Sequence, residues 1–303
     1  MKLRRRNSPR VIDRRGAPSG RGFGLPGLGG GGGGGLGPSI PIGKGGGIGL
    51  IVVLLVLAVC VGPQVLGGDG GPFSGLNPAG TGSAPLDPAT DPDAKLFQLV
   101  NDVVSDVEET WAGIFEGSDP AFEPAFVNVF SERTSSGCGA ASSATGPFYC
   151  PADQQIYLDL SFFRELRDRF GAPGDFAQAY VIAHEYGHHI QNLLGINADV
   201  QQRSQEDPGQ ANDLSIRLEL QADCLAGVWG HSAYAQDEVT TEDLNEALTA
   251  AEAIGDDRIQ ESTTGRIDPE TWTHGSAEQR SRWLGIGFES GDPNDCDTFD
   301  GDI

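Results

Sequence analysis

Residues 184–189 read His-Glu-Tyr-Gly-His-His, and this stretch decides how the rest of the sequence is interpreted. It lies in a run from Phe176 to about Leu194 that follows an aspartate and precedes a glycine, which predicts a helix with both ends marked. In that helix His184 and His188 are one turn apart on one face, where two imidazoles can share a tetrahedral Zn²⁺. Glu185 lies on the flank, where its carboxylate can reach a water molecule at the metal. The alternative is a chance match on an ordinary surface helix.

A second helix, predicted from about Ala211 to Ala235, carries two carboxylates one turn apart. Glu219 and Asp223 lie on one face of an otherwise apolar stretch. Burying both is costly unless a cation compensates them. We therefore predict Glu219 as the third zinc ligand and Asp223 as the acceptor of a hydrogen bond from a ligand histidine. The alternative is that these carboxylates pair with Arg217 or lie on an exposed face.

The remaining patterns predict an α+β fold in which helices dominate. Apolar residues spaced three to four apart predict helices over 92–116, 241–260 and 277–289. Two short runs, Phe126–Arg133 and Phe148–Leu160, flank a Gly-rich loop, and they predict two paired strands of a small antiparallel sheet.

Four cysteines lie in this part of the chain, and the C-x-x-C spacing typical of a metal cluster does not occur in the sequence. Cys138 and Cys150 flank a turn-rich segment, which favours a disulfide that closes a hairpin. Cys224 and Cys296 would then form a second bridge. Four cysteines can pair in three ways, and the sequence leaves the choice among them open.

The net charge of −23 is divided unevenly along the chain. Residues 1–44 carry a charge of +8, and the remaining residues carry −31. No residue between Gly45 and Gly62 is charged, and this run is near the short end of what spans about 30 Å of hydrocarbon. We therefore predict one transmembrane helix over 48–62, with the arginine-rich N-terminus in the cytoplasm. The alternatives are a signal-peptide core, a lipoprotein signal at Cys60 and a buried core helix.

This interpretation divides the chain into four parts. A basic, Gly-rich cytoplasmic tail (1–47) and a single-pass membrane anchor (48–62) precede a flexible linker (63–92). Residues 93–303 then form one domain outside the cytoplasm. The acidity of this domain excludes a nucleic-acid binder, because neutralising phosphates requires a Lys/Arg surface.

The two central helices together resemble those of the gluzincin metallopeptidases, in which H-E-x-x-H is followed by E-x-x-x-D. Over nearly its full length, the chain is also similar to a bacterial family of single-pass neutral zinc metallopeptidases. The stretches that carry this resemblance are Arg14–Gly16, Gly137–Gly139, Gly146–Asp153, Tyr157–Ser161, Gly174–Gln178, His184–Gln191, Glu219–Cys224, Gly227–His231, Ala253–Arg258 and Thr273–Gly275.

The resemblance implies a predominantly helical, zincin-like domain that binds one Zn²⁺ and hydrolyses peptide bonds in protein or peptide substrates. In zinc chemistry, Glu185 would take a proton from the zinc-activated water and return it to the leaving amine. His274 lies in a segment similar to a Thr-His-Pro…Arg element of membrane-embedded gluzincins, which implies a donor to the oxyanion. The alternative for His274 is a loop or helix-cap histidine. The strand before the zinc helix is implied to pair with an extended substrate.

We therefore expect a membrane-anchored, extracytoplasmic zinc metallopeptidase. The alternative is a catalytically silent module at the membrane that binds zinc or a partner. Glu185 favours the enzyme, because a silent module has no need of a carboxylate that is not a metal ligand.

Overall fold

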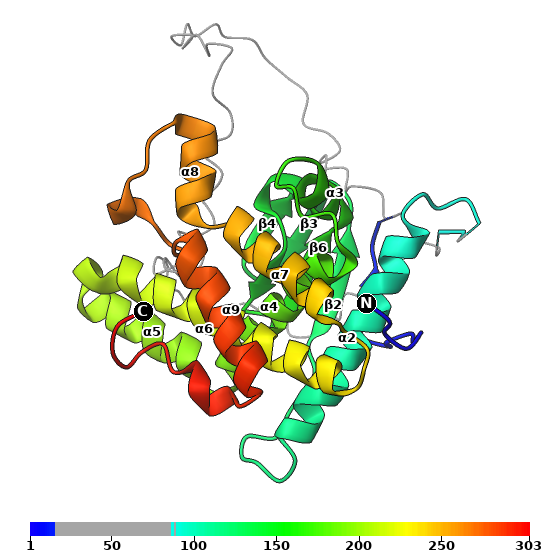
Figure 1. Ribbon diagram of the computed structural model, residues 1–303, viewed down its shortest axis with the longest axis horizontal. Helices are drawn as coiled ribbons and strands as arrows, with labels where there is room; N and C mark the ends of the chain where they lie inside the picture. The colour runs from blue at the N-terminus through cyan, green and yellow to red at the C-terminus, as the bar shows by residue number, and fades with distance from the viewer. Residues whose placement is uncertain (16–85, 88) are drawn as a thin grey trace, which may run out of the picture.

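The computed structural model describes residues 1–15, 86–87 and 89–303 (Figure 1). The strands lie together beside a larger group of helices, so the predicted predominance of helices with a small sheet is confirmed. The strands are β1 (Val11–Asp13), β2 (Phe126–Phe130), β3 (Arg133–Ser136), β4 (Gly139–Ser142), β5 (Phe148–Cys150) and β6 (Gln155–Asp159). The helices are α2 (Ala94–Ile114), α3 (Leu160–Asp168), α4 (Asp175–Leu193), α5 (Ile196–Glu206), α6 (Ala211–Ala235), α7 (Thr241–Ala253), α8 (Asp256–Thr264) and α9 (Ala277–Ser290).

The main sheet is mixed, which corrects the prediction of an antiparallel one. Its strand order is β1-β2-β6-β5, with β1, β2 and β6 parallel and β5 antiparallel to β6. A separate hairpin joins β3 and β4. The run predicted as one strand over 148–160 turns back after Pro151, and Gln154 in this turn has a positive φ of 58°. The turn separates β5 from β6 and lets β6 run parallel to β2.

The core forms where the sheet meets α2 and α4. Strand alternation directs two β2 side chains and two β6 side chains to one face, where all four are fully buried. Helix α2 contributes four valines at helical spacing to the same cluster. Burying each of these aliphatic side chains stabilises the fold by about 1.5–3 kcal/mol. The buried residues are Val127 and Val129 of β2, Ile156 and Leu158 of β6, and Val100, Val103, Val104 and Val107 of α2.

Helices α4, α6 and α9 approach one another closely because glycines lie at their contacts. A Cβ atom on Gly187 of α4 would lie 2.9 Å from the Cα atom of Ala222 on α6. A Cβ atom on Gly287 of α9 would lie 1.9 Å from the carbonyl oxygen of Cys224, also on α6. Any larger residue would push these helices apart. Gly187 thus sets the short distance between the two helices that carry the predicted site.

Most predicted helices agree with the observed ones, with two differences. The helix predicted over 241–260 is divided into α7 and α8 at Gly255, where a Cβ atom would lie 2.4 Å from the backbone nitrogen of Ala277. Helices α3 and α5 were not predicted: α3 is short and begins directly after β6, and α5 has a polar sequence in which Val200 alone is buried.

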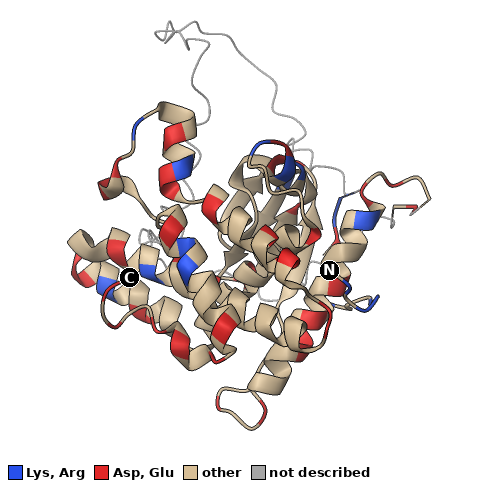
Figure 2. Ribbon diagram, in the orientation of Figure 1, with Lys and Arg blue, Asp and Glu red and all other residues tan. Residues whose placement is uncertain are grey.

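Residues 1–15 form a basic arm that packs against the domain. Strand β1 of this arm pairs with β2, placing Val11 opposite Val127. Figure 2 shows acidic residues on most helices. Three arginines of the arm form ion pairs with carboxylates of the domain. These ion pairs are Arg4–Glu238, Arg6–Glu109 and Arg15–Asp91.

The docked arm corrects the predicted membrane topology. Because arm and domain share one sheet, they cannot lie on opposite sides of a membrane. Among the residues that the structure describes, no helix combines the length and apolar character needed to cross a bilayer. The prediction of a single-pass protein with a cytoplasmic N-terminus and an extracytoplasmic domain is therefore wrong. The predicted anchor (48–62) and most of the predicted linker (63–92) lie outside the described residues.

The physical reason for this error lies in the arm's arginines. The positive-inside rule treats clustered arginines as a topology signal. In the structure several of them neutralise carboxylates of the acidic domain instead, and Arg15 is buried against Asp91 with each side chain 4 % exposed. A charge count cannot distinguish these two uses of arginine.

Candidate metal centre

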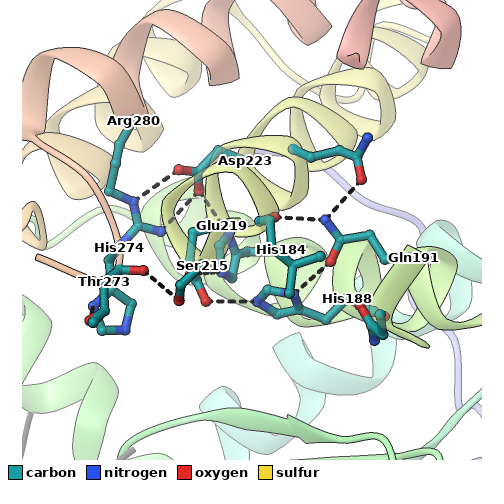
Figure 3. Close-up of polar contacts among 12 residues, drawn as sticks. His184, His188, Gln191, Ser215, Glu219, Asp223, Thr273, His274 and Arg280 are labelled. Carbon is teal, nitrogen blue, oxygen red and sulfur yellow. Dashed lines mark hydrogen bonds and ion pairs between the residues drawn. The ribbon is translucent and has the colours of Figure 1, made fainter. Parts of the chain in front are cut away.

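Three predicted ligands converge where α4 crosses α6 (Figure 3). Nε2 of His184 lies 3.2 Å from one carboxylate oxygen of Glu219, and Nε2 of His188 lies 3.4 Å from the other. One potential ligand atom from each of the three residues lies within 4.8 Å of the other two. Two imidazole nitrogens and one carboxylate form a ligand set known for catalytic zinc.

Asp223 determines which nitrogen of His184 faces this cluster. Its Oδ1 lies 2.7 Å from Nδ1 of His184, and Arg280 donates two hydrogen bonds to the same carboxylate at 2.9 and 3.0 Å. Tyr180 donates a further bond at 2.6 Å. Burial opposes ionisation of Asp223, but Arg280 and then His184 hold the pKa of this carboxyl below its usual range. An ionised Asp223 can only accept, so Nδ1 of His184 carries the proton and Nε2 faces Glu219.

The charges at the cluster fit a bound cation. Burial opposes protonation of His184, but Asp223 and Glu219 outweigh it and raise the pKa of this imidazole to about 10. Burial also opposes ionisation of Glu219, yet its histidine neighbours hold the pKa of this carboxyl well below its usual range. Without metal, the positive charge therefore lies on an imidazole between two carboxylates. A divalent metal would replace that proton and satisfy the same carboxylates.

His188 is oriented by an amide. Its Nδ1 lies 2.8 Å from Oε1 of Gln191, which is fully buried one helical turn further along α4. The amide nitrogen of Gln191 donates to the backbone carbonyl of Leu218 at 2.6 Å. The amide oxygen therefore faces the imidazole, and Nε2 of His188 is left toward Glu219.

Glu185 is buried beside the two histidines, with 7 % of its surface exposed. Burial raises the pKa of its carboxyl, and the imidazoles of His184 and His188 partly oppose this rise. The backbone of Tyr149 in β5 also opposes this rise in the pKa of Glu185, which places that strand close to the carboxyl. A carboxyl whose pKa is moved toward neutrality is suited to accept and return a proton.

His274 reaches the cluster from the segment before α9. Its Nδ1 lies 3.2 Å from Oδ1 of Asp256, and the other oxygen of Asp256 accepts from the backbone N–H groups of Thr273, His274 and Gly275. Asp256 thus fixes both the loop and the ring. Burial opposes protonation of His274, but Asp256 and then Glu219 raise the pKa of this imidazole. The effect of Glu219 shows that His274 lies near the metal cluster.

The other two histidines of these helices make structural contacts. Nε2 of His189 lies 2.6 Å from the carbonyl oxygen of Glu123, and Nδ1 of His231 lies 2.8 Å from that of Phe288. Both histidines therefore stabilise packing away from the cluster. The structure also pairs Cys138 with Cys150 and Cys224 with Cys296, which is one of the three connectivities that the sequence allowed.

Several residues of the site were missed from the sequence, among them Tyr180, Gln191 and Asp256. Tyr180 precedes His184 by four residues and Gln191 follows His188 by three, so helical spacing alone places both near the ligands. Asp256 carried no such signal, because its partner His274 lies 18 residues further along the chain. The contact between them depends on how the α7–α8 turn folds against the start of α9.

Comparison with known proteins agrees with this geometry. The family described as "Putative neutral zinc metallopeptidase" matches residues 1–299. "Uncharacterized protein YpfJ" from Escherichia coli (strain K12) is 48 % identical over 215 residues, which cover 71 % of this chain and 74 % of that protein. "Uncharacterized protein Rv2575" from Mycobacterium tuberculosis (strain ATCC 25618 / H37Rv) is 49 % identical over 191 residues, covering 59 % of this chain and 64 % of the relative. No solved structure matches the chain. The match over residues 1–299 shows that the chain belongs to this neutral zinc metallopeptidase family.

Proposed function

We propose that this chain is a zinc-dependent peptidase that hydrolyses peptide bonds in protein or peptide substrates. One observation carries the proposal: Nε2 of His184, Nε2 of His188 and the Glu219 carboxylate face one another, with Glu185 buried beside them. The first three would hold the zinc ion. When bound, zinc supplies Lewis acidity, which makes water more acidic and polarises a carbonyl group.

Glu185 moves the proton in this proposal. Its carboxylate accepts a proton from the attacking water and returns it to the nitrogen of the leaving amine. Burial raises the pKa of Glu185, which makes its carboxylate a stronger base. The backbone of Tyr149 lies close to this carboxylate, on the edge strand of the sheet.

His274 stabilises developing charge in this proposal. Asp256 raises the pKa of the imidazole and binds its Nδ1, so the protonated ring presents Nε2–H as a donor. A charged donor aimed at a developing oxyanion typically lowers the barrier by about 3–4 kcal/mol. His274→Ala is therefore expected to lower kcat strongly while the protein still binds zinc.

The substrate would lie along β5. This strand is an edge of the main sheet, and the backbone of its Tyr149 lies close enough to Glu185 to lower the pKa of that carboxyl. An edge strand can bind an extended peptide by adding it as a further strand. This geometry supports an unfolded or extended peptide as the substrate.

The test compares zinc content and cleavage of denatured casein by the purified full chain. We expect one zinc per chain and cleavage that a chelator abolishes. Glu185→Gln should keep the zinc and lose cleavage, whereas Asp175→Asn, at an exposed position in the first turn of α4, should behave like the wild type. A zinc-loaded wild type that cleaves no better than Glu185→Gln would favour the silent binding module.

A further inference from the structure

We propose that Gln191 and Gln221 are positioning residues, which connect the ligand His188 to the Cys224–Cys296 disulfide through a buried chain of amide hydrogen bonds. This inference rests on the proposed metal site. Neither glutamine would touch the metal or the substrate. Their role would be to hold one imidazole in the tautomer and orientation that a metal needs.

The chain of hydrogen bonds begins at His188. Nδ1 of this imidazole faces Oε1 of Gln191 at 2.8 Å. An amide can present either oxygen or nitrogen to a neighbour, so something must fix its orientation. Nε2 of Gln191 donates to the carbonyl of Leu218 at 2.6 Å and to Oε1 of Gln221 at 3.1 Å, and these two acceptors determine the orientation (Figure 3).

Gln221 is oriented in the same way. Its Nε2 donates to the backbone carbonyl of Cys296 at 3.0 Å, so its Oε1 faces Gln191. A carbonyl can only accept, and each amide along the chain therefore has one allowed orientation. The Cys296 carbonyl thus fixes the orientation of the Gln221 amide, and Gln221 fixes that of Gln191. Oε1 of Gln191 then faces His188 and requires a proton on Nδ1 of that imidazole.

The disulfide holds the far end of this chain. Cys224 lies on α6 one turn after Gln221, and its bond to Cys296 fixes the C-terminal segment against α6. Both cysteines are buried, with 0 % and 1 % of their surfaces exposed. Other bonds also hold this segment, including the one from the Thr298 hydroxyl to the carbonyl of Arg217 at 2.6 Å. Loss of the disulfide should therefore loosen the Cys296 carbonyl without releasing the segment.

The first test measures zinc affinity by competition with a chelator, using the full chain. Gln191→Met removes the acceptor at nearly constant volume and should weaken zinc binding by about 10–100-fold. Gln191→Glu keeps an oxygen facing Nδ1 but loses the donor to Leu218 and Gln221, so it should bind zinc more tightly than Gln191→Met and less tightly than the wild type. If Gln191 were merely structural, Gln191→Glu would bind zinc more weakly than Gln191→Met, because the glutamate variant buries an extra charge.

The second test concerns the disulfide. Replacing Cys224 and Cys296 together with alanine should weaken zinc binding several-fold, and this effect should disappear when Gln221→Met is already present. The matched control removes Cys138 and Cys150 instead, and it should leave zinc affinity unchanged. Equal zinc affinities for the wild type and Gln191→Met would overturn this proposal but not the proposed function. The same holds if removing Cys224 and Cys296 weakens zinc binding as much in Gln221→Met as in the wild type. A wild type that binds no zinc would overturn the proposed function with it.

Discussion

Nδ1 of His184 lies 2.7 Å from Oδ1 of Asp223, and this contact fixes the nitrogen that the imidazole turns toward Glu219. Asp223 is itself held by Arg280 and Tyr180, so four side chains from α4, α6 and α9 form one buried network. The same carboxylate thus orients a proposed metal ligand and neutralises a buried guanidinium. This double role explains why a charged residue lies in the apolar part of α6.

Asp223→Asn should weaken zinc binding by about 10–100-fold, because the amide is a weaker acceptor for the Nδ1 proton of His184. It should also destabilise the zinc-free protein by about 3–5 kcal/mol, since Arg280 loses its buried partner. Chelator competition and urea unfolding measure the two effects separately. Tyr180→Phe is the control, because it removes one hydrogen bond and keeps the carboxylate. Equal zinc affinities for Asp223→Asn and Tyr180→Phe would contradict the assigned role.

The pair formed by Asp256 and His274 should give the zinc-free protein a pH-dependent stability. His274 has a pKa raised from 6.5, so its contribution is complete below about pH 6.5 and is lost as pH rises through the folded value. Asp256 has a pKa lowered from 3.8, so its contribution is complete above about pH 3.8 and is lost as pH falls through the folded value. The difference in unfolding free energy between wild type and His274→Gln should be largest from about pH 4 to 6.5.

That difference is measured by urea unfolding with a chelator present. A constant difference from pH 3 to pH 9 would show that the two groups do not stabilise the fold as an ion pair.

Gly187→Ala should destabilise the protein by about 1–3 kcal/mol, because the new methyl group would overlap the backbone of Ala222. Zinc affinity should fall as well, since Glu219 would move away from the two histidines. Gly285→Ala in α9 is the control. No atom lies within 4 Å of its Cβ position, and alanine favours a helix by about 1 kcal/mol. Similar zinc affinities for the two variants would contradict the role of Gly187.

Arg15→Met should destabilise the full chain by about 3 kcal/mol, because it leaves the buried carboxylate of Asp91 without its partner. Arg5→Met, at an exposed position of the same arm, should change stability by less than about 0.5 kcal/mol. Urea unfolding of both variants checks this difference. Equal free energies of unfolding for Arg15→Met and Arg5→Met would mean that the arm does not dock on the domain in solution.

Local sequence patterns predicted the parts of the molecule that depend on spacing within one helix. The bounds of α4 and α6, and hence the faces that carry His184, His188 and Glu219, followed from helical periodicity and end signals. Proximity between the two helices was inferred from the cost of burying carboxylates, and the structure places them together. The reason for their close approach, the missing side chain of Gly187, could not be inferred without knowing the crossing point.

Features that depend on long-range pairing were not predictable in this way. The parallel pairing of β2 with β6 and the addition of β1 join segments that have no local signal for each other. Asp256 and His274 meet because two turns pack together. The arginines of the arm were misinterpreted because the charge of a segment does not show whether it faces lipid or an acidic protein surface.

The most direct test of the central claim is a paired measurement of zinc content and peptide cleavage on the wild type and Glu185→Gln. The proposed function predicts one zinc per chain in both proteins, with chelator-sensitive cleavage of casein in the wild type and a loss of at least about 10²-fold in the variant. Equal cleavage by the two zinc-loaded proteins, or no zinc in the wild type, would contradict it.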